Sequence, residues 1–412
     1  MRKALAIPSL RALWLGQGIS VFGNVFLQIA AFWILQLRSP YLLVAAGVVI
    51  ALPQLLAFLG GVLVDHFGAW RLMVLTDVVR AAVVGTVLVV ALTDPAITPY
   101  LLLAALALTT LGGALFNPAE GTLLPEVVSG DELVAANGLM QGTSQTASAV
   151  GAAMGGAALL AIGVDSILGF DAATFVASVV SLWFVTSRSR GRVAPANTPA
   201  ISLSAIREGL SAARDLRWLI QTVPVIALTN LLGFAAFISL PYWVHHVLHG
   251  TVADYGLFDA LWAGGIILGS LLAASFSRWP AWKVISVMGV VQGLLLCLFP
   301  LWQSIPAELA ILAMGGLLNG VINAIAVSVI QQLIPEAMRG RVLGMVVTLL
   351  SLGTPLGPLV TGVFFLTGWS LVILWMLSGA SGIVFGLVWG LSTDVRAALA
   401  QGFTRAAPVP GA

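Results

Sequence analysis

The sequence predicts an all-α membrane protein with twelve transmembrane helices arranged in two six-helix bundles. Three observations support this fold class. First, the chain of 412 residues is 59% hydrophobic and only 8% charged, whereas soluble domains carry about 25% charged residues. Second, its apolar residues fall into twelve runs of about 20 residues, the length that crosses a bilayer as a helix. Third, the two halves of the chain repeat a set of short patterns.

The twelve runs alternate with short polar turns. Their approximate bounds are 14–37, 42–64, 72–92, 98–118, 138–163, 166–186, 218–240, 255–276, 284–303, 306–328, 343–366 and 369–391. A transmembrane β-barrel would show weaker segments of about ten residues with alternating hydrophobicity. The first run is too long for a signal-peptide core and lacks a small-residue cleavage site. We therefore expect it to be the first transmembrane helix.

The positive charges predict the orientation. Arg38 lies on one side of the twelve-span arrangement and Arg80 lies inside the third span, whereas every other Arg and Lys falls on the opposite side. Cytoplasmic loops of membrane proteins carry an excess of Lys and Arg. Both termini are therefore predicted to be cytoplasmic. Because topology distributes the charges in this way, the net charge of +2 does not indicate a nucleic-acid partner.

The polar segment in the middle of the chain predicts the domain organisation. Residues 1–190 are expected to form the N-terminal bundle and residues 218–395 the C-terminal bundle. The linker, residues 191–217, is basic and Pro-bearing at first and then has the pattern of an amphipathic interfacial helix. Residues 396–412 are expected to be a cytoplasmic tail.

The halves share sequence patterns at nearly constant offsets. Asp65–Arg71 aligns with Ser277–Lys283, and Leu124–Glu126 aligns with Ile334–Glu336. Two glycine pairs of the fifth span have counterparts in the eleventh: Gly138/Gly142 with Gly340/Gly344, and Gly151/Gly155 with Gly353/Gly357. Such pairs are expected to let helix backbones approach closely. Internal repeats are typical of two-bundle transporters, whose substrate site lies between the repeats near the midplane of the bilayer.

The turn from Gly60 to Arg71, with Gly61, Asp65 and Gly68, resembles the loop between helices two and three of major facilitator transporters. Phe116–Glu120, Leu240–Trp243 and Ile334–Arg341 are similar to the branch that holds bacterial drug–proton antiporters of the macrolide-efflux type and enterobactin exporters. The resemblance implies the major facilitator fold in a bacterial cytoplasmic (inner) membrane. It also implies export of an amphiphilic drug or siderophore by alternating access, with proton antiport as the expected source of energy.

Polar and aromatic residues inside the spans are candidates for a substrate cavity. Asn24 and Gln28 share one face of the first helix with Gln17 and Ser20, as helical spacing predicts. The resemblance implies that helices one, four, seven and ten line the cavity. The candidates are Asn24, Gln28, Asn117, Asn230, Phe234, Trp262, Asn319 and Asn323. The alternative is that these groups form interhelical hydrogen bonds that hold the bundle together.

Asp259 is the candidate for proton coupling. It shares a helical face with Tyr255 and Trp262, and an acid inside a membrane span is a candidate for a proton relay. The alternative is a carboxylate at the outer interface. Asp171 in the sixth span is interpreted as an interfacial or structural residue. Relatives of this branch often have an acid where this chain has Asn24, so an uncoupled facilitator and a lysophospholipid flippase stay open as alternatives.

A second group of residues is a candidate cytoplasmic gate: Gly61, Asp65, Gly68, Arg71, Asp77 and Arg80. Asp77 and Arg80 are three residues apart on one helix and can therefore form an ion pair. We interpret the group as a latch that breaks when the bundles move. The alternative is a static cluster that secures the turn.

No cofactor, metal site or catalytic motif is expected. His245, His246 and His249 have no nearby carboxylate or cysteine to complete a metal site, and the single Cys297 cannot form an intrachain disulfide. There is no phosphate-binding P-loop and no anchored nucleophile–base pair, so an enzyme is not predicted. The expected partners are a small-molecule substrate, protons and the lipid bilayer, and the expected state is a monomer.

Overall fold

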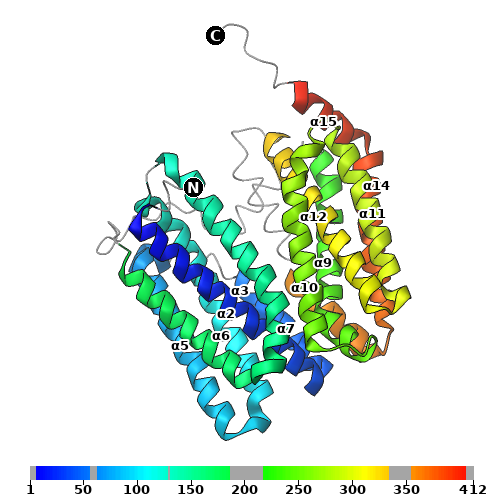
Figure 1. Ribbon diagram of the computed structural model, residues 1–412. Coiled ribbons are helices and arrows are strands. Elements are labelled where there is room, and N and C mark those ends of the chain that lie inside the picture. The colour runs from blue at the N-terminus through cyan, green and yellow to red at the C-terminus, as the bar shows by residue number, and fades with distance from the viewer. Residues whose placement is uncertain (1–5, 56–62, 129, 186–216, 334–353, 405–412) are drawn as a thin grey trace. The chain divides into compact units, whose positions relative to one another are not determined.

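The computed structural model describes residues 6–55, 63–128, 130–185, 217–333 and 354–404, and Figure 1 shows that these residues are helical almost throughout. Several expected features fall outside these ranges. They are Gly61, nearly all of the linker 191–217, the Ile334–Arg341 segment with Gly344 and Gly353, the start of the span 343–366, and the tail after Thr404.

Within the described ranges, nine helices are long and apolar enough to cross a membrane. They contain α2 (Pro8–Arg38), α5 (Ala69–Thr93), α6 (Thr98–Val127), α7 (Gly130–Trp183), α9 (Arg217–His246), α10 (Val252–Leu272), α11 (Ala281–Trp302), α12 (Ile305–Leu333) and α14 (Leu371–Leu391). Two shorter apolar helices lie at Pro40–Pro53, within α3 (Pro40–Leu55), and at Thr354–Thr367. The remaining elements are the 3-10 turns η1 (Pro95–Ile97) and η2 (Ala273–Phe276) and the helix α15 (Thr393–Thr404). The total of twelve spans stays a prediction.

Glycines with positive φ mark two of the predicted boundaries. Gly68 precedes α5 with φ 81° and ψ 145°, a conformation that costs little only for glycine. Gly163 has φ 75° and ψ 171° inside α7, so that helix bends at this residue. This non-helical residue lies between the predicted fifth and sixth spans, so the range labelled α7 comprises two helices joined at Gly163.

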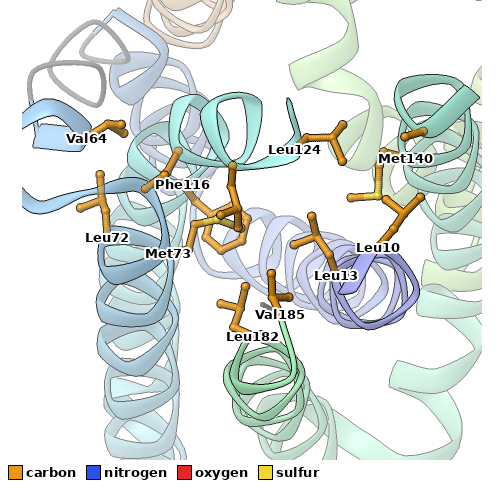
Figure 2. Close-up of a cluster of buried hydrophobic side chains, with 14 of the residues drawn as sticks. Leu10, Leu13, Val64, Leu72, Met73, Phe116, Leu124, Met140, Leu182 and Val185 are labelled. Carbon is orange, nitrogen blue, oxygen red and sulfur yellow. The ribbon is translucent and has the colours of Figure 1, made fainter. Parts of the chain in front are cut away.

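The helices form two compact units. The first comprises Met1–Ala200 together with Leu240–Ala260, and the second comprises Ile201–Ser239 and Leu261–Ala412. In the first unit, α2 packs mainly against α7, α5 against α6 and α7, and α3 against α6. Figure 2 shows one of its apolar clusters, where Leu13 of α2, Met73 of α5, Phe116 of α6 and Leu182 of α7 point toward a common centre.

The second unit is built around α11 and α14, and α12 packs against α11. Its apolar cluster includes Trp218 of α9, Ile285 of α11, Ile322 of α12 and Trp389 of α14. Lipid tails are as apolar as these side chains, so burial alone does not hold the helices together. Close packing between backbones therefore has to contribute.

Small residues provide this close packing between α11 and α14. A Cβ atom added to Gly379 of α14 would lie 2.5 Å from the Gly293 carbonyl oxygen and 2.5 Å from Cys297 Sγ of α11. One added to Gly386 would lie 2.6 Å from the carbonyl oxygen of Ser286. These distances are far below van der Waals contact, so the two backbones approach as closely as glycine allows.

We predict opposite effects of alanine at two helical glycines. Gly379→Ala forces α11 and α14 apart, and overpacking of this kind costs about 1–3 kcal/mol. Gly85→Ala on α5 meets no atom within 4 Å, and alanine is better than glycine in a helix by about 1 kcal/mol. Thermal unfolding of the purified protein in detergent should give a lower midpoint for Gly379→Ala and an equal or higher one for Gly85→Ala. A higher midpoint for Gly379→Ala would contradict the close approach.

Candidate functional site

A groove in the first unit is a candidate ligand site. Its volume is about 640 Å³, and it lies between α2 and the first half of α7. The α2 side is lined by Trp14, Leu15, Gly18, Ile19 and Phe22; the α7 side is lined by Gly138, Leu139, Gly142, Thr143, Thr146, Ala147 and Val150. No charged side chain is among them. Ligand sites for small organic molecules have volumes of roughly 300–1,000 Å³ and are mainly apolar.

The few polar groups of this groove are paired within its wall. Trp14 Nε1 donates a hydrogen bond to Thr143 Oγ1 at 2.6 Å, and this bond joins α2 to α7. Thr146 Oγ1 donates to the Gly142 carbonyl oxygen at 2.8 Å. The wall is therefore suited to the apolar part of a ligand.

The glycines of α7 divide into two kinds. A Cβ atom on Gly151 would lie 3.2 Å from Val25 of α2, and one on Gly155 would lie 3.4 Å from Ile29. This is the close approach that the glycine spacing predicts. Gly138 and Gly142 show no such approach among the described residues, because a Cβ atom on either would meet none of their atoms within 4 Å. These two glycines widen the groove instead.

The predicted cavity amides of the first unit lie on two helices. Asn24 of α2 is half-buried, and its Nδ2 donates to the Ser20 carbonyl oxygen at 3.0 Å. Gln28 of α2 and Asn117 of α6 are exposed. No hydrogen bond joins these three side chains in the part of the chain that the structure describes.

The predicted cavity residues of the second unit lie on three helices. Asn323 Nδ2 donates to Asn319 Oδ1 on α12 at 2.7 Å, and Asn230 of α9 is exposed. Trp262 of α10 packs against the ring of Phe237 of α9, with ring centroids 4.7 Å apart. Phe234 of α9 packs against Gly357. The structure therefore joins Asn319 to Asn323, and it packs Trp262 against Phe237.

Asp259 lies on α10 and is half-buried. Tyr255, one turn earlier, is buried, with 5% of its surface exposed. It interacts electrostatically with Asp259. The ring of Tyr255 also stacks on Trp33 of α2, with centroids 6.3 Å apart and planes at 17°. Sequence reasoning missed Trp33, because contacts between distant helices leave no local pattern.

The predicted gate residues do not form a single network. Asp65 is half-buried and Arg71 is exposed, beside the start of α5, while Asp77 and Arg80 are buried further along it. At 1.5 Å per residue, Asp77 lies about 12 Å along the helix axis from Ala69. Among the described residues, no ion pair joins Asp65 or Arg71 to this buried pair. Gly61 lies outside the described residues.

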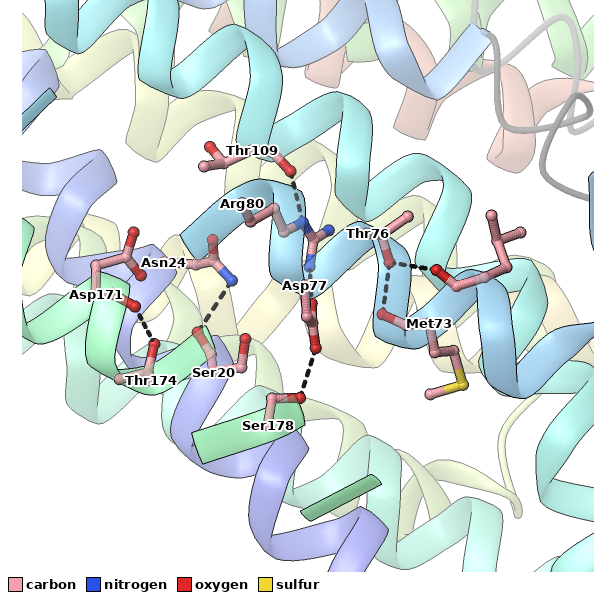
Figure 3. Close-up of polar contacts among 11 residues, drawn as sticks. Ser20, Asn24, Met73, Thr76, Asp77, Arg80, Thr109, Asp171, Thr174 and Ser178 are labelled. Atoms are coloured by element: carbon pink, nitrogen blue, oxygen red, sulfur yellow. Dashed lines mark hydrogen bonds and ion pairs between the residues drawn. The ribbon is translucent and has the colours of Figure 1, made fainter. Parts of the chain in front are cut away.

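Asp77 and Arg80 form a buried ion pair, with Arg80 Nη1 3.1 Å from Asp77 Oδ1. Three helices meet at this pair, as Figure 3 shows. Arg80 Nε donates to the Thr109 carbonyl oxygen of α6 at 3.1 Å. Ser178 Oγ of α7 donates to Asp77 Oδ2 at 2.6 Å. Each member of the pair thus has a further partner on a neighbouring helix.

Aromatic rings and glycines complete the surroundings of Arg80. Its guanidinium carbon lies 5.5 Å from the ring centroid of Phe116 and 5.3 Å from that of Phe175, within the range of a cation–π interaction. A Cβ atom on Gly113 would lie 2.7 Å from Arg80 Nη2, so a larger residue there would displace the guanidinium.

Sequence reasoning missed the α7 side of this cluster. Asp171, Thr174 and Ser178 recur at spacings of three and four residues, which places them on one helical face. That face meets α2 and α5 in the structure, since a Cβ atom on Gly23 of α2 would touch Thr174 and Asp171. The spacing was a usable signal of a buried polar face.

Comparisons with known proteins agree with this architecture. The profile of a family described as transmembrane secretion effector matches residues 3–406. The chain is 28% identical over 317 residues to the multidrug efflux pump Tap of Mycobacterium tuberculosis, covering 76% of this chain and 75% of that protein. It is 27% identical over 330 residues to the lysophospholipid transporter LplT of Yersinia pestis, covering 77% of each.

Solved structures of transporters share the fold at low sequence identity. The nucleoside transporter NupG aligns with a TM-score of 0.71 at 13% identity, covering 93% of this chain and 98% of that one. A bacterial homolog to the human lysosomal transporter Spinster aligns with a TM-score of 0.65 at 14% identity, covering 98% of each chain. At this identity the likeness concerns the fold alone.

We predict that Arg80→Gln destabilises the protein more than the double substitution Asp77→Asn/Arg80→Gln. The single change leaves a buried carboxylate without its cation, which costs about 3–5 kcal/mol, and the second change removes that carboxylate. Thermal unfolding in detergent should therefore show partial recovery in the double variant. Additive losses would contradict an energetic coupling between the two side chains.

Proposed function

Because this chain belongs to the transmembrane secretion effector family of the major facilitator superfamily, we propose that it exports amphiphilic organic molecules of the drug or siderophore class. Membership makes it a multi-pass membrane transporter of small molecules and not an enzyme. We place it in a bacterial cytoplasmic membrane as a monomer with both termini in the cytoplasm.

The groove between α2 and α7 is the observation that carries this proposal. A volume of about 640 Å³ accommodates the apolar body of an organic molecule, and the wall carries no charge that would select a small ion. The multidrug efflux pump Tap, a relative by sequence, supports efflux as the direction of transport.

Amides supply the polar half of the proposed site. Asn117, Asn230 and Asn323 are exposed on helices that are long enough to span a membrane. Polar side chains in such spans are costly in lipid and usually face the bundle interior or a water-filled cavity. We propose that these amides, with Asn24, Gln28 and Asn319, line a central cavity to which Phe234 and Trp262 add aromatic surface.

The proposed transport cycle is alternating access by two six-helix bundles, residues 1–190 and 218–395. Residues 191–217 would link the bundles along the cytoplasmic surface, and residues 396–412 would form the cytoplasmic tail. In this cycle the turn containing Gly61, Asp65, Gly68 and Arg71 serves as the cytoplasmic gate. The ion pair of Asp77 and Arg80 holds α5, the helix that follows this turn, against its neighbours.

Proton antiport through Asp259 is the proposed source of energy. We predict that Asp259→Asn abolishes export driven by a pH gradient but leaves counterflow of unlabelled against labelled substrate, because counterflow needs no net proton movement. The measurement is export of a macrolide by proteoliposomes with and without the gradient. Asp165→Asn, an exposed acid on α7, is the control and should keep both activities. An uncoupled facilitator would instead show transport in wild type without any effect of the gradient.

A lysophospholipid transporter is the second candidate. The sequence similarity to LplT favours it, and so does a groove whose wall is suited to an acyl chain. Proteoliposomes should therefore be tested with a macrolide, a catecholate siderophore and a lysophospholipid. Transport of the macrolide or siderophore supports the exporter, and movement of the lysophospholipid alone replaces it with the second candidate.

We also predict that Gly142→Leu reduces transport by filling the groove. Its side chain points into open space, so the fold should tolerate the change while the ligand loses volume. Gly121→Leu on α6 also meets no atom within 4 Å but lies away from the groove lining, which makes it the matched control. The measurement is the apparent KM for the transported probe, with the thermal midpoint as a check of folding. Equal KM values for the two variants would place the substrate elsewhere.

A further inference from the structure

Asp171 is a buried acid that the proposed function does not use. It lies on α7, eight residues after the bend at Gly163, and its exposed fraction is 0%. Neither of its carboxylate oxygens has a hydrogen-bond partner among the described residues. The Thr174 hydroxyl, one turn along the helix, donates to the carbonyl oxygen of Asp171 rather than to the carboxylate. An ionised carboxylate is not normally left in this situation.

Residues of α2 and α5 face this carboxylate. On α2, Oδ1 of Asp171 lies 2.6 Å from the place where a Cβ atom of Gly23 would be, so glycine at this position makes room for the acid. On α5, Arg80 is the charged group whose electrostatic field reaches it, with Asp77 bound to that same arginine. Asn24 of α2, drawn between Asp171 and Arg80 in Figure 3, carries no charge.

The charges of this cluster do not balance when both acids are ionised. Two carboxylates, Asp77 and Asp171, then share the single guanidinium of Arg80 inside the unit. The observed geometry gives that guanidinium to Asp77, which accepts a second bond from Ser178. Asp171 receives neither bond, and a proton on its carboxyl group makes the cluster neutral.

We propose that Asp171 is a proton-binding site of the first unit, and that Arg80 is shared between Asp77 and Asp171 according to whether this proton is present. With the proton bound, Arg80 pairs with Asp77, as observed here. When Asp171 gives its proton to water, the new carboxylate attracts the guanidinium away from Asp77. Because the proton carries its positive charge away, the net charge of the cluster changes from zero to −1.

This exchange also links the proton to the packing of helices. Arg80 is held by the Thr109 carbonyl oxygen of α6 and by the rings of Phe116 on α6 and Phe175 on α7. A movement of the guanidinium toward Asp171 changes each of these contacts. The inference rests on the proposed export function in one respect: it gives that transport a second proton carrier besides Asp259, which belongs to the same unit.

The test is infrared spectroscopy of the purified protein in detergent across a pH titration, without any substrate. The carbonyl band of a protonated carboxyl group should be present at neutral pH in wild type and lost in Asp171→Asn. It should be unchanged in Asp165→Asn, the exposed acid on the same helix. Asp171→Glu retains an acid and should shift the band without removing it, so this variant answers the question if Asp171→Asn does not fold.

The exchange of partners has its own variant. Asp77→Asn leaves Asp171 as the acidic partner of Arg80, so the Asp171 band should disappear at neutral pH and return only at more acidic pH. Because protonated Asp259 would absorb in the same region, the Asp171 band is the difference between the spectra of wild type and Asp171→Asn. Identical bands in the two proteins overturn the proton site. A band that Asp77→Asn leaves at the same pH overturns the exchange of Arg80 between the two acids.

Proteoliposomes then test the link to transport, with erythromycin as the probe. Asp171→Asn should lose accumulation driven by a pH gradient and keep counterflow; full retention of gradient-driven accumulation overturns the coupling role. Absence of erythromycin transport in wild type would count against macrolide export alone, because the infrared result does not depend on it.

Discussion

The ion pair of Asp77 with Arg80 is the interaction on which the first unit depends. Both side chains are buried, and burying a charge is tolerated only when it is paired and hydrogen-bonded. The partners that satisfy the pair come from α6 and α7, so these helices must hold their positions relative to α5. The need to pair these buried charges therefore fixes how α5, α6 and α7 pack. Apolar contacts in lipid do not fix helix packing in this way.

Glycine distribution explains how the same kind of helix serves two purposes. Between α11 and α14, Gly293 and Gly379 remove side-chain volume so that backbones touch. In α7, Gly138 and Gly142 remove volume where none of the described helices fills the space, and a groove results. Spacing along the sequence is the same in the two pairs of α7, and only the neighbouring helix distinguishes packing from cavity.

The sequence was sufficient for the helical membrane fold because long apolar runs leave one solution for the backbone in lipid. It also anticipated the pairing of Asp77 with Arg80 and the turn at Gly68, since both depend on residues close in the chain. It did not anticipate the partners Thr109 and Ser178, nor the separation of Asp65 from the buried pair. Those depend on which faces of distant helices meet. The sequence interpretation of Asp171 is an interfacial or structural residue, although its spacing with Thr174 and Ser178 indicates a buried polar face.

The hydrogen bond between Trp14 and Thr143 has a consequence for selectivity. The groove wall uses its own donors and acceptors internally, so a molecule seated there is discriminated by size and shape. One methylene group in an apolar pocket changes affinity by only about 1–3 kcal/mol. Such a wall accepts chemically unrelated compounds of similar bulk. When a single side chain of the wall gains or loses a carbon, the relative affinities for these compounds change by a small amount. No single change of this kind abolishes binding.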